Sequence, residues 1–143
     1  MANYAQRKGR ESKKREELKK QLSGSTFTPL RHDIVNSPQF LALSLSAKWV
    51  FIRLCGKYNR LNNGDLSAPL TQAKEEFNLS TQGLKNALDE LVKTKFLEIT
   101  RQGNKKLCSL FALTCYPLNE INKAGLFLQS TSKPKDSWKQ PDE

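Results

Sequence analysis

The stretch from Ser80 to Lys106 constrains the fold of this chain more than any other part of the sequence. Apolar residues recur there at positions i, i+3, i+4, i+7 and i+8, namely Leu84, Ala87, Leu88, Leu91 and Val92. This spacing predicts an amphipathic helix with one buried face, and Ser80 is a residue type that caps such a helix. The opposite face is polar and carries Thr81, Gln82, Lys85, Asn86 and Asp89.

Two β-prone segments follow this helix, over 96–100 and 107–116, with a polar turn between them. The turn spans 101–106 and is basic. A polar-faced helix followed by a hairpin with a basic tip is the layout of a winged helix-turn-helix, which places the helix in the major groove of DNA and the loop on the phosphates. The expected fold class is mainly α with a small antiparallel β-hairpin, a winged helix-turn-helix with N- and C-terminal extensions.

The charge balance favours a polyanion as the partner. The 143 residues include 24 Lys and Arg against 14 Asp and Glu, which gives a formal net charge of +10. Such a charge suits DNA, RNA or an anionic membrane surface. No apolar run is long enough to span a bilayer, and no apolar segment of the secretory type follows the basic N-terminus.

The cysteines indicate a reducing compartment. Cys55, Cys108 and Cys115 lie in apolar surroundings and are odd in number. They are expected to be small buried residues and not parts of disulfides. The expected location is therefore the cytoplasm, on the nucleoid.

The sequence divides into four parts. Residues 1–26 form a basic arm, which is expected to be mobile, to be a frayed helix that orders on a partner, or to be a solubilising tail. Residues 27–116 hold the winged helix-turn-helix domain. Residues 117–128 are expected to form a short C-terminal helix or packing segment. Residues 129–143 are expected to be a disordered tail, in which Trp138 is a solvated side chain or a tail anchor.

Within the domain, helices are expected over 38–43, 47–58 and 71–77, ahead of the helix that follows Ser80. Ser46 is expected to cap the second of these. The run 62–65, Asn-Asn-Gly-Asp, predicts a turn, and 65–67 a very short strand that pairs with the hairpin. The short connection over 78–80 suits a helix-turn-helix.

Several motifs in 27–116 resemble those of a known family. They are Leu30 with Ser37, Pro38 and Phe40, Leu45 with Ser46 and Ala47, Tyr58 with Asn59, the run 62–66, and the run 100–103 ahead of 110–114. Together they are similar to small proteobacterial winged helix-turn-helix proteins that are common on mobile elements and described as replication-protein-like. The resemblance implies a winged-helix fold and DNA binding, without a known operator or effector. Similar proteins often have glycine before the hairpin strand, where this chain has Lys95.

The polar face of the predicted helix offers groups that read DNA bases. Gln82 and Asn86 can contact adenine through their amides, and Lys85 can reach O6 or N7 of guanine. Thr81 lies beside them, and the helix start at Ser80 presents backbone N–H groups to a phosphate. The alternative is that these are ordinary solvated residues.

The hairpin tip offers charge for the DNA backbone. Like charges in a short loop repel one another, so a polyanion partner explains their clustering. The alternative is a soluble loop that protects a sheet edge. The candidate residues in this loop are Arg101, Asn104, Lys105 and Lys106.

No set of residues suggests catalysis or a metal site. The single histidine, His32, lies beside Asp33 without a Gly-rich phosphate loop or a nucleophile motif, and is expected to be structural. Cys108 and Cys115 are seven residues apart, which on one strand puts them on opposite faces, so a zinc site is not expected. We expect a protein that is not an enzyme, with no cofactor and no small-molecule ligand.

Several roles remain open. One is a transcriptional regulator of a mobile element that binds double-stranded DNA as a homodimer, through the N-terminal helix and residues 118–128. Another is a plasmid or phage replication or partition factor that binds origin repeats. A third is a protein-interaction module whose basic arm docks on RNA or an acidic partner. Membrane attachment is disfavoured because the arm lacks an apolar face.

Overall fold

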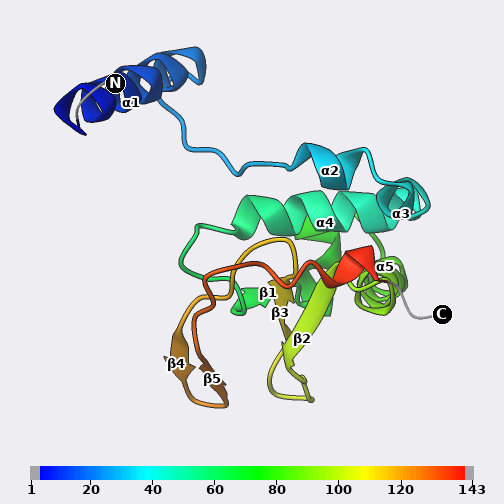
Figure 1. Ribbon diagram of the computed structural model, residues 1–143. Helices are drawn as coiled ribbons and strands as arrows, with labels where there is room; N and C mark the ends of the chain where they lie inside the picture. The colour runs from blue at the N-terminus through cyan, green and yellow to red at the C-terminus, as the bar shows by residue number, and fades with distance from the viewer. Residues whose placement is uncertain (1–3, 141–143) are drawn as a thin grey trace.

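Helices occupy the first part of the chain and short strands the second (Figure 1). The computed structural model describes residues 4–140. The α-helices are α1 (Tyr4–Gln21), α2 (His32–Val35), α3 (Pro38–Leu41), α4 (Leu45–Lys57) and α5 (Thr81–Lys93). The strands are β1 (Leu66–Ser67), β2 (Leu97–Arg101), β3 (Leu110–Leu113), β4 (Ile121–Lys123) and β5 (Leu126–Leu128). Short turns of 3₁₀ or π type are η1 (Leu70–Gln72), η2 (Ala73–Phe77) and η3 (Ser137–Lys139).

Serine side chains start the helices of the core. Ser37, Ser44 and Ser80 each have an extended backbone conformation. The side-chain hydroxyl of each accepts the backbone N–H of the residue three positions later, which satisfies one of the unpaired donors of a helix start. The prediction that Ser46 caps α4 is wrong, because the helix begins at Leu45 and Ser44 takes that role. The predicted cap of α5 at Ser80 is confirmed.

The principal sheet has three antiparallel strands in the order β1–β3–β2. The short strand predicted at 65–67 is present, and its Leu66 lies opposite Phe111 of β3. The register between β2 and β3 shifts between Ile99 and Arg101. Strand β3 is shorter than the strand predicted over 107–116, because residues 102–109 form a loop and the chain turns after Leu113.

The fold is mixed and not mainly α, since 44% of it is helical and 13% is strand. The helix predicted within 117–128 is wrong, because β4 and β5 form a two-stranded hairpin there. Gly125 at its turn has φ 78°, a left-handed conformation that glycine adopts without strain. The helix predicted over 71–77 is irregular, a 3₁₀ turn followed by a π turn that ends at Asn78 with φ 53°.

The core lies among α4, α5 and the inner face of the sheet. Phe40, Phe51 and Phe96 meet edge to face, with ring centroids 5.5–5.9 Å apart. Such geometry adds to the stabilisation that burial alone provides. Trp138 stacks on Phe96 at 5.6 Å and is 3% exposed, so it belongs to this cluster.

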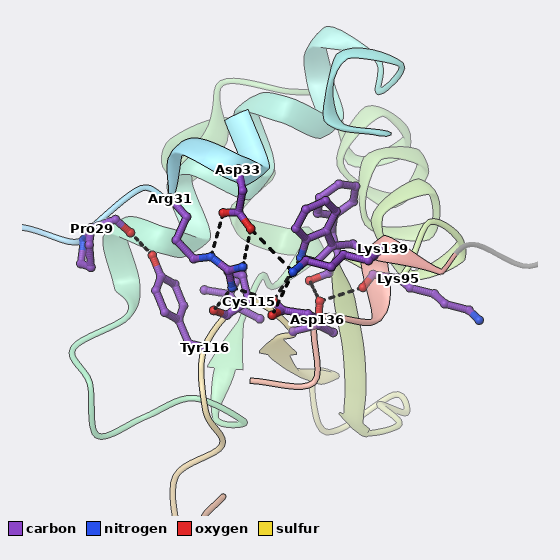
Figure 2. Close-up of polar contacts among 12 residues, drawn as sticks. Pro29, Arg31, Asp33, Lys95, Cys115, Tyr116, Asp136 and Lys139 are labelled. Carbon is purple, nitrogen blue, oxygen red and sulfur yellow. Dashed lines mark hydrogen bonds and ion pairs between the residues drawn. The ribbon is translucent and has the colours of Figure 1, made fainter. Parts of the chain in front are cut away.

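The prediction of a disordered tail over 129–143 is wrong for 129–140, and residues 141–143 lie outside the described residues. Figure 2 shows how this tail is held by Arg31, whose Nη1 lies 2.6 Å from Asp136 Oδ1 and donates to the Cys115 carbonyl. Nη2 of Arg31 lies 2.6 Å from Asp33 Oδ2, and this hydrogen bond lowers the pKa of Asp33. The Tyr116 hydroxyl donates to the Pro29 carbonyl beside them. The tail therefore joins segments far apart in the sequence.

Residues 4–21 of the N-terminal arm form one continuous helix, α1, which stands away from the rest of the molecule (Figure 1). It ends at a left-handed turn, with φ 55° at Ser23 and φ 74° at Gly24, and the Gly24 N–H donates to the Lys19 carbonyl. The chain is next held at Thr28, whose Oγ1 donates to the Cys55 carbonyl at the end of α4. No helix within 4–140 has both the length and the apolar character to cross a membrane.

The cysteines differ from one another in exposure. Cys55 and Cys115 are buried as predicted, and burial raises the pKa of the Cys55 thiol to about 12. Cys108 is exposed, because it lies in the loop between β2 and β3 and not in a strand. His32 is exposed at the start of α2, so it does not pack as expected.

Candidate nucleic-acid interface

Helix α5 separates apolar from polar residues along its whole length. Leu84, Ala87, Leu88 and Leu91 are buried. The predicted contact residues on the other face are all exposed, and they are Thr81, Gln82, Lys85 and Asn86. Packing on the core thus fixes the orientation of this polar face.

The polar side chains of α5 pair with one another. Gln82 Nε2 donates to Asn86 Oδ1 at 2.8 Å, one helical turn away. Lys85 Nζ lies 3.1 Å from Asp89 Oδ2, so the lysine charge is partly balanced on the helix itself. The Ser80 hydroxyl accepts the Gly83 N–H at 3.0 Å and serves as the cap. These weak, exposed pairs leave the side chains free to exchange partners.

The loop between β2 and β3, residues 102–109, is ordered by its own hydrogen bonds. Asn104 Oδ1 accepts the backbone N–H groups of Lys106 and Leu107 at 2.8 and 3.1 Å. The Gly103 N–H donates to Ser109 Oγ, and a Cβ on Gly103 would lie 2.5 Å from the Ser109 nitrogen. Asn104 is therefore used to shape the loop, a role that its residue type alone did not reveal.

The basic residues of this loop play different parts. Arg101 Nη2 donates to the Cys108 carbonyl at 3.0 Å, so its side chain closes the base of the loop. Its Nε is buried and has no hydrogen-bond partner within the described chain. Lys105 and Lys106 are exposed, and their ammonium groups form no ion pair among residues 4–140. The two lysines are thus the charges of the loop that a partner can reach.

A groove of about 600 Å³ runs between α5 and this loop. Three lysines and one aspartate border it, which are Lys85, Lys105, Lys106 and Asp89. It also has apolar lining residues that were not predicted as site residues, namely Leu70, Val92, Ile99, Leu107 and Phe111. The structure therefore brings Lys85 together with the lysines of the loop along one groove.

Of the remaining predicted residues, Asn104 lines this groove and the others do not. Ser80 and Thr81 border a separate hollow of about 400 Å³ at the start of α5, with Thr71 and Lys74. Gln82, Asn86 and Arg101 line neither hollow. Lys74 was missed because only the tertiary fold brings η2 beside the start of α5. No three His, Cys, Asp or Glu side chains within 4–140 gather closely enough to hold a metal ion.

No known family model matches this chain, and no curated protein or solved structure matches it significantly. The resemblance to mobile-element winged helix-turn-helix proteins therefore remains a prediction from the sequence motifs. The functional argument rests on the geometry of α5 and the loop.

Proposed function

We propose that this protein binds double-stranded DNA as a winged helix-turn-helix, with α5 in the major groove and loop 102–109 on the phosphate backbone or in the minor groove. The observation that carries the proposal is the groove that Lys85 of α5 shares with Lys105 and Lys106 of the loop. A duplex offers a deep groove flanked by phosphates, and these two elements offer a polar helix beside fixed positive charges.

The size and chemistry of α5 support this role. Its 13 residues make a helix roughly 20 Å long, and the major groove admits a helix of this width. Gln82 and Asn86 lie one turn apart and share a single exposed hydrogen bond. Their remaining amide N–H and oxygen groups can contact an adenine once the helix lies in the groove.

The loop supplies the backbone contact. Because Asn104 and Gly103 fix its shape, Lys105 and Lys106 are held in position before DNA binds. Little conformational entropy of the loop backbone is then lost on binding. Their like charges repel each other in the free protein, and phosphate groups relieve this repulsion.

Two biological roles fit such a binder. A transcriptional regulator of a mobile genetic element would act as a homodimer at an inverted repeat near a promoter. A replication or partition factor would instead occupy iterated direct repeats at an origin. Selection of binding sites from random duplex DNA, followed by sequencing, separates them by the symmetry of the recovered site. Both roles place the protein on the nucleoid in the cytoplasm.

Two classes of variant test the DNA-binding proposal itself. Lys105→Ala and Lys106→Ala are expected to weaken binding to selected and random duplexes alike and to reduce the salt dependence, since they remove phosphate contacts. Gln82→Ala is expected to weaken only the selected site, by about 1–3 kcal/mol. Fluorescence anisotropy between 50 and 300 mM salt (roughly the range over which such contacts are screened) measures both effects.

The matched control is Lys133→Ala, which removes one exposed lysine from the C-terminal segment, away from α5 and the loop. It is expected to change affinity far less than Lys105→Ala. Equal losses in all three lysine variants would mean that only the overall charge matters, and equal losses on both duplexes for Gln82→Ala would remove the major-groove assignment.

A protein-interaction module is the second candidate, because part of the groove lining is apolar. Leu70, Ile99 and Leu107 are 37–49% exposed there. This reading predicts that Ile99→Asp abolishes binding to a protein partner, while Lys105→Ala and Gln82→Ala leave DNA affinity unchanged. The same anisotropy series therefore decides between the two candidates.

A further inference from the structure

Helix α4 is apolar on two faces, and only one of them is covered. Its inner face packs in the core through Ala47, Val50, Phe51 and Leu54. Its outer face exposes Leu45 (82%), Trp49 (45%) and Ile52 (37%), followed by the exposed Gly56. The steps of four, three and four residues put these positions on one narrow line of the helix surface. We call this line the α4 seam, consisting of residues 45, 49, 52 and 56.

The α4 seam is pre-ordered. Trp49 Nε1 donates to the Phe77 carbonyl at 2.8 Å, which fixes the indole ring. Arg53 lies over the same ring at 5.9 Å and donates to the Glu76 carbonyl. A fixed tryptophan loses little side-chain entropy when it is covered, and such residues often anchor interfaces.

The seam is complementary to itself when two copies meet antiparallel. A two-fold axis between residues 50 and 51 places Leu45 opposite Gly56 of the other copy, and Trp49 opposite Ile52. A Cβ added to Gly56 meets nothing within 4 Å, so there is open space for a leucine to enter. A large residue thus faces a small one at both ends of the contact, as in close helix packing.

The groups at the two ends of α4 already have partners within one copy. At the N-terminal end, Glu90 accepts the Ser44 N–H and hydroxyl, and at the C-terminal end Lys57 pairs with Glu76 at 2.6 Å. An antiparallel pair still opposes the two helix dipoles favourably.

The N-terminal helix is a poorer occupant. Its sequence has no apolar face that could cover the seam, whereas a second copy brings an apolar seam of its own. Residues 118–128, the other dimer surface expected from the sequence, are partly used in packing, although Phe127 is 76% exposed. Leu126 is buried, and Leu128 lies so close to Gly64 that a Cβ there would come within 2.4 Å of it.

We propose that the α4 seam is a homodimer interface in which Leu45 of each copy packs over Gly56 of the other. Together with Leu41, the seam exposes an apolar patch on the order of 500 Å², at the upper end for a monomer surface. Stable dimers bury about 800 Å² per partner, so this interface supports a reversible dimer. The inference is independent of DNA binding, because the dimer is measured without DNA.

Sedimentation equilibrium of the full chain tests the interface, at about 0.5 M salt so that the net charge of +10 is screened. A concentration-dependent dimer is expected, with a Kd of about 1–100 μM. Leu45→Glu is expected to raise this Kd at least tenfold. The control is Leu61→Glu, which changes an equally exposed leucine outside α4 and is expected to leave the Kd unchanged. A wild-type protein that stays monomeric at about 1 mM, or equal effects of both variants, overturns the proposal.

The pairing of Leu45 with Gly56 has its own test. Leu45→Ala removes the large residue, and Gly56→Leu fills the space that receives it, so each single variant is expected to weaken the dimer. The double variant L45A/G56L exchanges the two residues and is expected to restore most of the lost affinity. Gly56→Leu also raises helix propensity, and its site is open, so the monomer stays folded. A double variant no better than either single one contradicts the antiparallel register.

Discussion

At the scale of single residues, the turn at 62–65 does more than reverse the chain. Asn63 is fully buried, and its Nδ2 donates to the carbonyls of Leu113, Tyr116 and Pro117. Its Oδ1 accepts the Leu113 N–H at 2.8 Å. The side chain therefore satisfies backbone groups at the end of β3 that could not otherwise find partners.

Replacing Asn63 tests this role. Asn63→Ala is expected to lower the free energy of unfolding by about 3 kcal/mol, because it leaves buried carbonyls and an N–H unpaired. Asn122→Ala, at an exposed position of β4, is the control and is expected to change stability by less than about 0.5 kcal/mol. Urea unfolding measures both, and similar midpoints for the two variants would contradict the assignment.

Lys95 has a conformation that the sequence did not predict. It follows α5 with φ 67°, a left-handed conformation that costs a non-glycine residue about 1 kcal/mol. Glycine adopts this conformation without strain and is common directly after a helix. The lysine also lies 3.4 Å from the Gln140 carbonyl, a long contact.

Lys95→Gly is expected to melt at a higher temperature than Lys95→Ala, because both variants lose the lysine contacts and only glycine relieves the backbone strain. Lys95→Ala keeps the strain and loses the contact, so its midpoint is expected to fall below that of the wild type. Differential scanning calorimetry compares the three proteins. A Gly variant that melts below the Ala variant would contradict the assignment of backbone strain at this position.

At the scale of elements, the sequence predicted the helix whose formation depends on neighbouring residues. The apolar spacing of 84–92 and the cap at Ser80 correctly predicted α5, because helix amphipathicity and capping depend on residues close together in the sequence. The same patterns failed for 117–128 and for the tail, where partners lie far away in the sequence. Candidate site residues were found by type, but only the fold separates Asn104, which shapes the loop, from Lys105, which faces solvent.

The tail over 129–140 is the element that composition misjudged most. Its polar residues suggested disorder, yet Trp138 enters the aromatic cluster and Asp136 pairs with Arg31. Trp138→Ala is expected to destabilise the fold by about 3–5 kcal/mol, since it empties a buried aromatic site. Thermal unfolding checks this loss. Phe127→Ala, at a 76% exposed position, serves as the control, and an equal midpoint for both would restore the disordered-tail view.

At the scale of the whole molecule, positive charge is divided between the N-terminal arm and the rest of the chain. The first twenty residues hold eight basic and three acidic side chains, so half of the +10 lies in an arm that stands apart from α5 and the loop. Phosphate binding by such an arm carries no sequence preference. If the protein binds DNA as proposed, the arm is expected to add affinity and the rest of the chain to add selectivity.

Removing residues 2–24 separates these contributions. The shortened protein is expected to bind duplex DNA roughly tenfold or more weakly at 0.1 M salt, with a shallower slope of log affinity against log salt. The recovered site motif is expected to stay the same, because α5 is intact. An unchanged slope would show that the arm has another partner or serves only solubility.

The segment that connects α1 to the rest of the chain is short. Only residues 25–27 lie between the left-handed turn that ends α1 and the anchor at Thr28, and three extended residues span about 10 Å. If α5 and the loop bind DNA as proposed, the arm is confined to a small volume around the same duplex, at an effective concentration in the millimolar range. A peptide of α1 alone can then be too weak a ligand to detect, while the same helix in cis strengthens binding by orders of magnitude.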